Sequence, residues 1–510
     1  MTAGTDENRE GEARLVLGSG YARLPERFFT RTAPEPVASP RLLAFNGALA
    51  ADLGLGLDGA DEEELAALFG GNALPRGSEA IAAAYAGHQF GQFVPQLGDG
   101  RAILLGEVRD RAGALREIQL KGSGPTPFSR GGDGRAALGP VLREYLVSEA
   151  MHALGIPTTR ALAAVASGQM VVRDRALPGA ILTRVAASHV RVGTFEFFAA
   201  RGDLAALAVL TDHVIARHYP EASDAPRPPL ALLEALIDRQ ALLVARWMHV
   251  GFVHGVMNTD NMSVSGETID YGPCAFLDVY DPATVFSSID QHGRYAYSNQ
   301  PHAAHWNLAR FAATLLPLID PLEARAAELA NAALGAFSRR FGAYWLDGMR
   351  RKLGLATDEE GDEDLVRAWL EALHRNRVDY TLAFRALADA AAAAGAHGDG
   401  DAGADAQLRR LFAEPGDCDR WASVWRARLA RDPLPAQARA AAMRRVNPAV
   451  IPRNHQIERA IEAAVSCDDL SVFTALSIVL ARPYDGGEPR AAYARPPLPE
   501  ERVLHTFCGT

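Results

Sequence analysis

Apolar residues recur at a short period in the first 200 residues of the chain and at a longer period after them. In the first part, short apolar runs bounded by glycine, proline and polar residues predict β-strands. The turn-like sequence RDRAG joins the first two runs, so these two predict a β-hairpin. The predicted strands are residues 101–108, 115–122, 160–165, 169–174 and 179–185.

Helical spacing of apolar residues first occurs at residues 137–155 and dominates from Asp203 onward. The clearest helices of the second part are predicted at 203–219 and 229–251. The low-complexity stretch 387–407 predicts a mobile loop or a fraying helix, and the last hundred residues predict further helices and a proline-rich tail. A strand-rich part followed by a helix-rich part predicts an α+β fold of two lobes with a ligand-binding cleft between them.

Composition and charge narrow the classes of function. The 510 residues carry a formal net charge of -10, which argues against a protein that wraps nucleic acid. The first residues do not form a secretory signal, and no apolar run approaches the roughly 18 residues that cross a bilayer. The four cysteines include no Cys-x-x-Cys pair, so a structural zinc site is not expected. We therefore expect a soluble, cytoplasmic protein that binds neither nucleic acid nor membrane.

The most specific stretch is GFVHGVMNTDNMSVSGETIDYGPCAFLD, residues 251–278, which is similar to part of the catalytic core of a protein kinase. Asn261 follows His254 by seven positions, the spacing of a kinase metal-binding asparagine, and Asp270 begins an Asp-aromatic-Gly triplet. Val256 stands where a kinase has its catalytic aspartate. The stretch therefore predicts either a kinase without activity or an enzyme that handles a nucleotide differently.

Oxygen-bearing side chains in this stretch indicate a divalent cation. Asn261 and Asp270 have the ligand atoms that Mg²⁺ or Mn²⁺ prefers when the ion bridges nucleotide phosphates. Asp260 is the nearby carboxylate left to accept a proton, and His254 is expected to be a hydrogen-bonded core residue. The alternative is a polar turn between two strands.

Four charged residues outside this stretch are candidates for contact with phosphates. Lys121 ends a predicted strand and Glu144 lies on the following predicted helix, a pairing that orients an ammonium towards phosphates in kinase-like folds. A lysine at a strand end is also typical of a solvated side chain. Arg184 and Arg191 stand among apolar residues, where a guanidinium needs an acidic partner or a bound anion. Phosphate binding and an internal salt bridge are alternatives for both arginines.

Two glycine-rich segments, QLGDGR and RGGDGR, are further candidates for phosphate contact. The first contains Gly98 and Gly100 just before a predicted strand, and the second spans residues 130–135. Glycines let backbone N–H groups approach phosphate oxygens closely. A structural turn is the favoured interpretation of the first segment, whereas a turn and phosphate contact are equal alternatives for the second.

Longer motifs then identify a family. The segments GHQFGQFVPQLGDGRAILLGE, LKGSGPTPFSRGGDGRA, REYLVSEAMHALGIPTTRAL and GFVHGVMNTDNMSVSGETIDYGP together resemble the selenoprotein O family, from about residue 20 to the C-terminus. The resemblance implies a kinase-like fold that binds ATP in a flipped orientation. It implies transfer of AMP, not the terminal phosphate, to a Ser, Thr or Tyr hydroxyl of a protein. UTP with Mn²⁺ is an alternative to ATP with Mg²⁺.

The resemblance also implies roles for individual residues. Arg184 and Arg191 would grip the distal phosphate, which points into the protein. Asn261 and Asp270 would coordinate the metal, and Asp260 would take the proton of the acceptor hydroxyl. The implied nucleotide-contacting residues are Gly98, Gly100, Arg101, Lys121, Asp133, Gly134, Glu144, Arg184, Arg191 and Asp270.

The implied organisation has four segments. Residues 1–80 are an N-terminal extension that packs on the core, and 81–192 are a kinase-like N-lobe. Residues 193–375 are a C-lobe with the catalytic and metal loop, and 376–510 are a C-terminal helical region with a cysteine-containing tail.

Cysteine usage marks a departure from some members of the family. Members carry selenocysteine or cysteine third from the end, and Cys508 fits the cysteine type. In some bacterial members this residue pairs with a cysteine in the loop after the Asp-aromatic-Gly triplet, but the corresponding DPATVFSSID has none. Cys274 is then the candidate for a regulatory disulfide with Cys508. Transfer of the γ-phosphate and a non-catalytic, nucleotide-binding scaffold are the competing functions.

Overall fold

Antiparallel strand pairing organises the first part of the chain. The structure is a computed structural model and describes residues 15–393 and 402–507. Its main sheet has eight strands in the order β1-β3-β6-β7-β10-β9-β2, with β8 paired to β10. These strands are β1 (Phe29–Arg31), β2 (Arg41–Phe45), β3 (Ile81–Ala83), β6 (Ala102–Arg109), β7 (Leu115–Lys121), β8 (Ala136–Ala137), β9 (Arg160–Val172) and β10 (Ala176–Ala186). Two small pairs are β4 (Gly87–Gln89) with β5 (Gln92–Val94), and β11 (Phe252–Val253) with β12 (Ala275–Phe276).

The predicted strands are confirmed, with one correction. Strands β6 and β7 form the predicted hairpin, and β10 contains the predicted strand 179–185. The separate strands predicted at 160–165 and 169–174 are wrong, because β9 runs through both. Its pairing with β10 shifts register between Pro178 and Ala180, and Gly168 adopts a φ of 69°. A β-bulge of this kind accommodates Ser167 and Gly168 within a continuous strand, although a Ser-Gly pair in a sequence is typical of a strand end.

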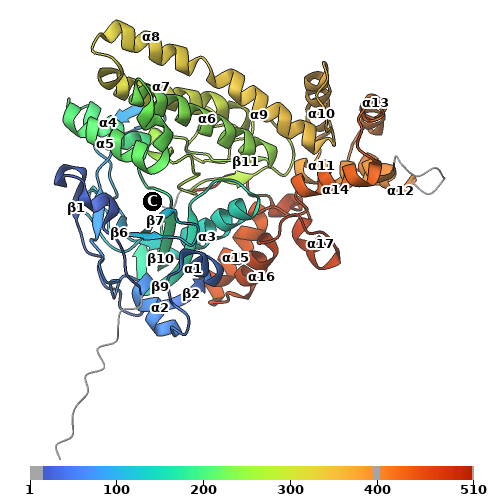
Figure 1. Cartoon of the computed structure of the whole chain (residues 1–510). Helices are drawn as coiled ribbons and strands as arrows, with labels where there is room; N and C mark the ends of the chain where they lie inside the picture. The colour runs from blue at the N-terminus through green and yellow to red at the C-terminus, as the bar shows by residue number, and fades with distance from the viewer. Residues whose placement is uncertain (1–14, 394–401, 508–510) are drawn as a thin grey trace, which may run out of the picture.

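Helices cover both faces of the sheet (Figure 1). Leu53 of α1 and Phe69 of α2 belong to one apolar cluster that includes Ile118 and Leu120 of β7. The predicted helix at 137–155 is α3, which packs on β9 and β10 from the other face. These three helices are α1 (Gly47–Leu53), α2 (Glu62–Phe69) and α3 (Leu138–Ala153).

The second part of the chain is helical, as predicted. The long helix α6 is central, and it packs against α7, α8 and α9. Helices α5 and α6 correspond to the predicted helices 203–219 and 229–251. The helices of this part are α4 (Val192–Ala199), α5 (Leu204–His218), α6 (Pro228–His249), α7 (Gln300–Ile319), α8 (Glu323–Leu334) and α9 (Phe337–Lys352).

The C-terminal helices divide between the two parts (Figure 1). Helices α10 to α14 extend the helical part around a cluster that contains Trp369, Trp421 and Trp425, whereas α15 and α16 return to pack against α3. The stretch 387–407 is helical at both ends, and residues 394–401 lie outside the described residues. These helices are α10 (Asp362–Asn376), α11 (Tyr380–Ala393), α12 (Ala402–Arg409), α13 (Pro415–Leu429), α14 (Ala436–Val446), α15 (Asn454–Cys467), α16 (Ser471–Leu480) and α17 (Glu488–Ala494).

The expected α+β class is thus confirmed: a strand-rich sheet precedes a helical region. Within residues 15–393 and 402–507, no helix has both the length and the apolar character that a membrane span requires.

Candidate active site

One face of the main sheet carries charged side chains. Alternate residues of a strand point to opposite faces, so Ile118 and Leu120 pack towards α1 and α2 while Gln119 and Lys121 point the other way. The register of β7 with β10 sets Gln119 opposite Arg184, whose Nη1 donates to Gln119 Oε1 at 3.4 Å. Arg184 and Lys121 therefore share the face that α3 covers.

Five charged residues meet on this face and form the ion cluster: Lys121, Glu144, Arg184, Arg191 and Asp270. Lys121 Nζ lies 2.6 Å from Glu144 Oε2 and 3.4 Å from Asp270 Oδ1. Arg184 donates to Glu144 Oε1 from Nε at 3.0 Å and to Asp270 Oδ1 from Nη2 at 2.8 Å. Arg191 Nη1 donates to Asp270 Oδ2. The structure thus contains the Lys–Glu pair of the prediction, and also the internal salt bridges that were the alternative for the two arginines.

The charges in the ion cluster hold its two carboxylates ionised. Burial raises the pKa of Asp270, but the charges of Arg191, Arg184 and Lys121 outweigh it, and the pKa lies well below its usual range. Burial likewise raises the pKa of Glu144, and Arg184 and Lys121 again lower it further than burial raises it. Burial lowers the pKa of Lys121, an effect that Glu144 opposes. With Lys121 protonated, three cations and two carboxylates leave one net positive charge.

The backbone at Asp270 is in a sparsely populated conformation. Its φ is 64°, in the left-handed region that non-glycine residues rarely adopt. Such a conformation persists only where the surroundings determine it, and it is frequent at functional sites. Here the bonds to Arg184 and Arg191 supply that constraint.

Asp260 lies in a short 3-10 turn, Thr259–Asn261, beside the ion cluster. Its backbone carbonyl accepts a hydrogen bond from Arg191 Nη1 at 2.6 Å, and its Oδ2 accepts one from Gln89 Nε2 at 3.3 Å. Its Oδ1 is buried and has no hydrogen-bond partner among the described residues. Burial raises the pKa of Asp260 to about 6, although the charge of Arg191 opposes this. A carboxylate of this kind is suited to accept a proton near neutral pH.

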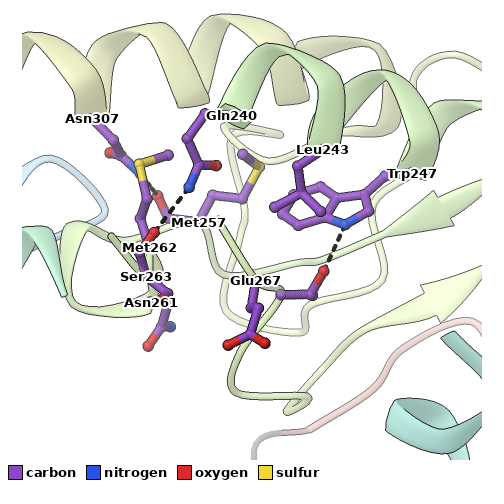
Figure 2. Close-up of a pocket in the computed structure, with 10 residues that line it drawn as sticks. Gln240, Leu243, Trp247, Met257, Asn261, Met262, Ser263, Glu267 and Asn307 are labelled. Atoms are coloured by element: carbon purple, nitrogen blue, oxygen red, sulfur yellow. Dashed lines mark hydrogen bonds between the residues drawn. The ribbon is translucent and has the colours of Figure 1, made fainter. Parts of the chain in front are cut away.

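Asn261 is oriented so that its oxygen remains available. Its Nδ2 donates to the carbonyl oxygen of Val256 at 3.0 Å. Figure 2 shows the Asn261 side chain pointing away from Gln240 and Asn307, which line the small cavity behind the loop. That cavity, of about 10 Å³, has room for little more than a water molecule.

Asn261 and Asp270 carry oxygen donors of the kind that a divalent cation binds. In the described ranges, no group of three or more His, Cys, Asp or Glu residues has the arrangement of a metal site made of protein alone. Mg²⁺ is commonly held by one or two protein oxygens together with substrate phosphates. The carboxylate of Asp270 and the Oδ1 atom of Asn261 provide such a partial set.

His254 is a core residue, as predicted. It is 1% exposed, and its ring Nε2 is hydrogen-bonded to the carbonyl oxygen of Ile269 at 2.9 Å. Its backbone N–H donates to Gln300 Oε1 at 3.0 Å. The residue therefore fixes the loop between β11 and β12.

The β4–β5 hairpin covers the Asp260 turn, a contact that the sequence patterns did not predict. The backbone N–H of His88 donates to Thr259 Oγ1 at 2.6 Å, and the N–H of Phe90 donates to Asn258 Oδ1 at 3.0 Å. Gly87 allows this close approach, since a Cβ there would lie 2.5 Å from Asp260 Oδ1. The density of glycine, aromatic and amide residues in GHQFGQF was the one available signal.

A second residue that the sequence analysis missed is Tyr85, just before this hairpin. The guanidinium of Arg191 lies over its ring, 4.9 Å from the centroid.

The first glycine segment has a structural reason for its composition. A Cβ at Gly98 would lie 2.3 Å from the ring of Phe128, and one at Gly100 would lie 2.8 Å from the Phe128 carbonyl oxygen. The absence of a side chain at both glycines therefore allows the loop that carries Phe128 to pack against them. Arg101 follows them, and its charge lowers the pKa of Lys121, which places it near the ion cluster.

The second glycine segment also packs on the chain itself. A Cβ at Gly134 would lie 2.0 Å from the carbonyl oxygen of Gly124, and Gly134 has a φ of 62°. Asp133 forms an ion pair with Arg173, with Oδ2 at 2.8 Å from Nη1, and half of its side chain is solvent-accessible. The structure thus gives Asp133 a partner outside the ion cluster.

The C-terminal tail reaches the segment that follows Asp270. Thr506 donates from Oγ1 to the carbonyl oxygen of Pro273, and its N–H donates to Phe286 O at 2.8 Å. Cys274 is buried next to this contact. Cys508 lies outside the described residues, so its disulfide with Cys274 stays a prediction.

These observations define an α+β protein with a buried charged site between its sheet and its helical part. Residues 14–481 match the family described as protein adenylyltransferase SelO. The protein nucleotidyltransferase YdiU of Rhizobium rhizogenes is 62% identical over 496 residues, 97% of each chain. The YdiU proteins of Rhizobium meliloti and a Bradyrhizobium species are 61% and 60% identical over 492 residues, 96% of this chain and 99% and 98% of theirs. The chain belongs to the SelO family of protein adenylyltransferases, which confirms the resemblance seen in its motifs.

Proposed function

We propose that this protein transfers AMP from ATP to a serine, threonine or tyrosine hydroxyl of another protein in the cytoplasm, and that its two parts form a kinase-like fold. The observation that carries the proposal is the ion cluster, in which two buried arginines and the partly buried Lys121 surround Asp270 beside the Asp260 turn. The Lys121–Glu144 pair supports the kinase-like arrangement. Val256, in place of the kinase base, supports a reaction at a different phosphate.

The cations of the ion cluster bind the triphosphate. Arg184 and Arg191 take the distal phosphates, since their guanidinium groups offer paired donors in a buried setting. Lys121 contacts the phosphates while Glu144 holds its ammonium in place. The positive charge then stabilises the pyrophosphate that leaves. The glycine segments, Arg101, Asp133 and Gly134 complete the nucleotide site.

The oxygens of Asn261 and Asp270 would hold Mg²⁺ or Mn²⁺. When bound, the ion offsets negative charge on the phosphates. With Mn²⁺ the same site accepts UTP and transfers UMP.

Asp260 receives the proton of the acceptor. The hydroxyl oxygen forms a bond to the α-phosphorus while the bond from this phosphorus to the oxygen bridging the β-phosphate breaks. Pyrophosphate leaves with the electron pair of that bond, and the hydroxyl proton moves to the Asp260 carboxylate. The buried, unpartnered Oδ1 of Asp260 supports this role.

Labelled ATP tests the proposal. Label should stay on protein when it is at the α-phosphate and not when it is at the γ-phosphate. Retention from the γ-position alone would support a kinase, and nucleotide binding without any transfer would support a scaffold. Asp260→Asn should lower transfer by about 100-fold or more while ATP still binds, and Asp347→Asn on the surface of α9 is the matched control.

A further inference from the structure

A surface patch adjoins the β4–β5 hairpin, and the proposed reaction does not use it. We name it the aromatic–arginine patch: His88, Phe93, Arg294, Trp306 and Arg310. The His88 ring lies 5.0 Å from the Phe93 ring and 5.2 Å from the Trp306 ring, between centroids. Arg294 and Arg310 lie over the Trp306 ring at 4.7 and 5.2 Å. Phe93 is 41% exposed, so the patch reaches solvent.

The two arginines of the patch are held by an aromatic ring without a neutralising acid. Within the described part of the chain, neither guanidinium has a carboxylate at ion-pair distance, and both Nε atoms are buried without a hydrogen-bond partner. Most arginines of the buried clusters are paired with carboxylates, as Arg184 and Arg428 are. The chain has a net charge of -10, so two unpaired cations side by side are a local exception. A guanidinium that is partly desolvated and unpaired favours an incoming carboxylate.

The patch is joined to the Asp260 turn through the β4–β5 hairpin. Gln89, the last residue of β4, contacts Asp260, and Phe93 on β5 pairs with His88 in the patch. At the turn between them, a Cβ on Gly91 would lie 3.4 Å from the guanidinium carbon of Arg294. His88 belongs to the patch and is also bonded to Glu196, through Nδ1 to Oε1 at 2.5 Å. Only the short β4–β5 hairpin therefore separates Asp260 from a polypeptide segment of another protein that is bound on the patch.

We propose that the aromatic–arginine patch is the docking surface for the acceptor protein, and that it selects acceptors with Asp or Glu residues close to the modified hydroxyl. This inference rests on the proposed function and names its substrate class. The carboxylates pair with Arg294 and Arg310, which Trp306 holds in place. Phe93 and Trp306 cover the apolar part of the acceptor segment, a common role for aromatic residues at interfaces. The rest of this acidic chain repels an acidic acceptor segment, so the segment is disfavoured in any orientation that takes its carboxylates away from the two arginines.

Two synthetic peptides test the inference by direct binding, independently of transfer. Both carry Ser, Thr and Tyr at the same positions, and they differ in flanking Glu or flanking Lys residues. In fluorescence anisotropy the Glu peptide should bind the wild-type protein at least about tenfold more tightly than the Lys peptide, and salt should weaken this binding. The variant Arg294→Glu/Arg310→Glu should reverse the preference. Equal binding of the two peptides to the wild-type protein would overturn the inference.

Controls separate this outcome from other failures. Arg325→Glu/Arg351→Glu reverses two exposed charges on α8 and α9 and should leave the preference intact. The milder variant Arg294→Gln/Arg310→Gln should lose the preference without reversing it, which distinguishes a docking role from a folding defect. ATP binding should be unchanged in each variant, and loss of ATP binding with Arg294→Gln/Arg310→Gln would assign these arginines to the nucleotide instead. If α-labelled ATP labels no protein, the proposed function fails. The preference for the Glu peptide is measured by binding alone, so it is tested independently of that result.

Discussion

The buried Arg184 forms an ion pair with the partly buried Asp270, in which Nη2 of the arginine lies 2.8 Å from Oδ1 of the aspartate. Arg191 is bonded to the other oxygen of the same carboxylate. Under the proposed function, Asp270 binds a cation and both arginines bind phosphates, so all three residues exchange partners together. Exchange on one side alone leaves a buried charge unpaired, which costs about 3 to 5 kcal/mol.

We therefore expect Asp270→Asn to strengthen binding of ATP in the absence of metal. In the variant, Arg191 and Arg184 lose the Asp270 carboxylate while Arg184 keeps its bonds to Glu144, so donors on both arginines become available to phosphates. Titration calorimetry in excess chelator should show ATP binding at least about tenfold tighter than to the wild-type protein. Added Mg²⁺ should improve binding to the wild-type protein far more than to Asp270→Asn. Equal metal-free affinities for the two proteins would show that the ion pair does not compete with the nucleotide.

The fit of the β4–β5 hairpin on the Asp260 turn predicts that Gly87→Ala impairs transfer. The added Cβ would lie 2.5 Å from Asp260 Oδ1, so the hairpin or the carboxylate must move. Transfer of α-label should fall by about 100-fold, since a small misplacement of a reacting group has effects of this size, while ATP affinity stays within a few-fold. Gly342→Ala on α9, where nothing lies within 4 Å of the new Cβ, is the matched control. It should keep full activity and raise the free energy of unfolding by about 0.5 to 1 kcal/mol.

Local patterns were sufficient to predict most of the elements. The β6–β7 hairpin and helices α3, α5 and α6 follow from apolar periodicity, which depends on neighbours within one turn or one strand. Strand β9 was divided wrongly because a Ser-Gly pair is typical of a turn, and only the pairing with β10 shows that the strand continues here.

Predictions for the site were limited in a different way. Motif spacing brought Lys121, Glu144 and Asp270 to attention, but the partners of Arg184 depend on strand register and on Asp270, 86 positions away. The contacts of the β4–β5 hairpin with the Asp260 turn join residues about 170 positions apart, such as His88 and Thr259. No periodicity in the sequence encodes such a contact, so the residues of the hairpin were noted only as part of the family motif GHQFGQFVPQLGDGRAILLGE.

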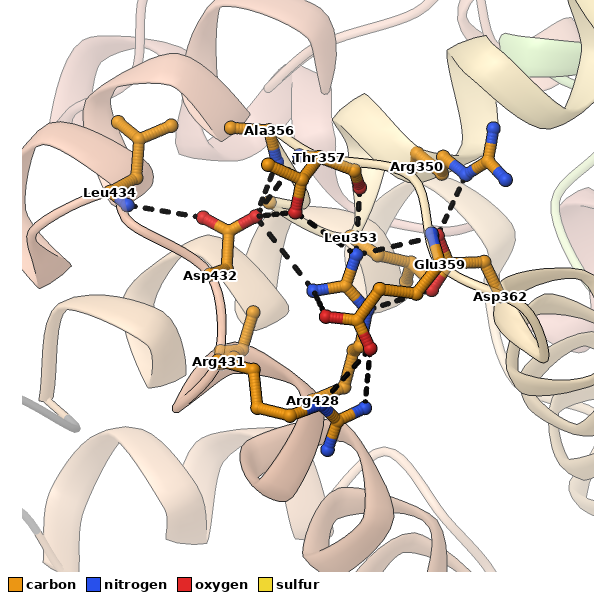
Figure 3. Close-up of polar contacts among 12 residues, drawn as sticks. Arg350, Leu353, Ala356, Thr357, Glu359, Asp362, Arg428, Arg431, Asp432 and Leu434 are labelled. Carbon is orange, nitrogen blue, oxygen red and sulfur yellow. Dashed lines mark hydrogen bonds and ion pairs between the residues drawn. The ribbon is translucent and has the colours of Figure 1, made fainter.

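A buried charge network stabilises the C-terminal helices α10 and α13, and its centre is Arg428. Figure 3 shows this side chain between Glu359, Asp362 and Asp432. Its Nε lies 2.8 Å from Asp362 Oδ1, and Nη1 lies 3.1 Å from Glu359 Oε1. The side chains of Asp362 and Asp432 are almost wholly buried, and Arg428 is the cation that they share, since Arg350 contacts only Asp362 and Arg439 only Asp432.

We expect Arg428→Met to lower the free energy of unfolding by about 3 to 5 kcal/mol, because it removes the buried cation shared by Glu359, Asp362 and Asp432 and leaves their negative charge only partly offset. Arg431→Met is the matched control, since Arg431 pairs with the same Glu359 but is 58% exposed. This control should change the free energy by less than about 1 kcal/mol. Urea unfolding followed by circular dichroism measures both values. If both variants lost a similar free energy of unfolding, the burial of Arg428 would not be the reason that the network stabilises the protein.

The last residue of α9 predicts an unusual dependence of stability on pH. Lys352 is 2% exposed, and its Nζ lies over the rings of Phe384 and Tyr380, at 4.1 and 5.4 Å from the centroids. Burial lowers the pKa of Lys352 from 10.5 to about 7. Between these two values the unfolded chain binds the proton and the folded chain does not. The unfolding free energy therefore rises with pH across this window, by up to about 1.4 kcal/mol per pH unit.

Lys352→Met should remove this dependence, because methionine has a similar shape and does not titrate. Relative to the wild-type protein, the variant should be more stable at pH 6 to 7, and its advantage should shrink as the pH rises towards 10. The comparison requires urea unfolding of both proteins across this range, since other groups titrate equally in each. Arg351→Met replaces the neighbouring exposed cation and should show no such trend. A difference between Lys352→Met and the wild-type protein that stays constant from pH 6 to 10 would mean that the buried amine keeps an ordinary pKa, and that the two rings stabilise its charge as well as water does.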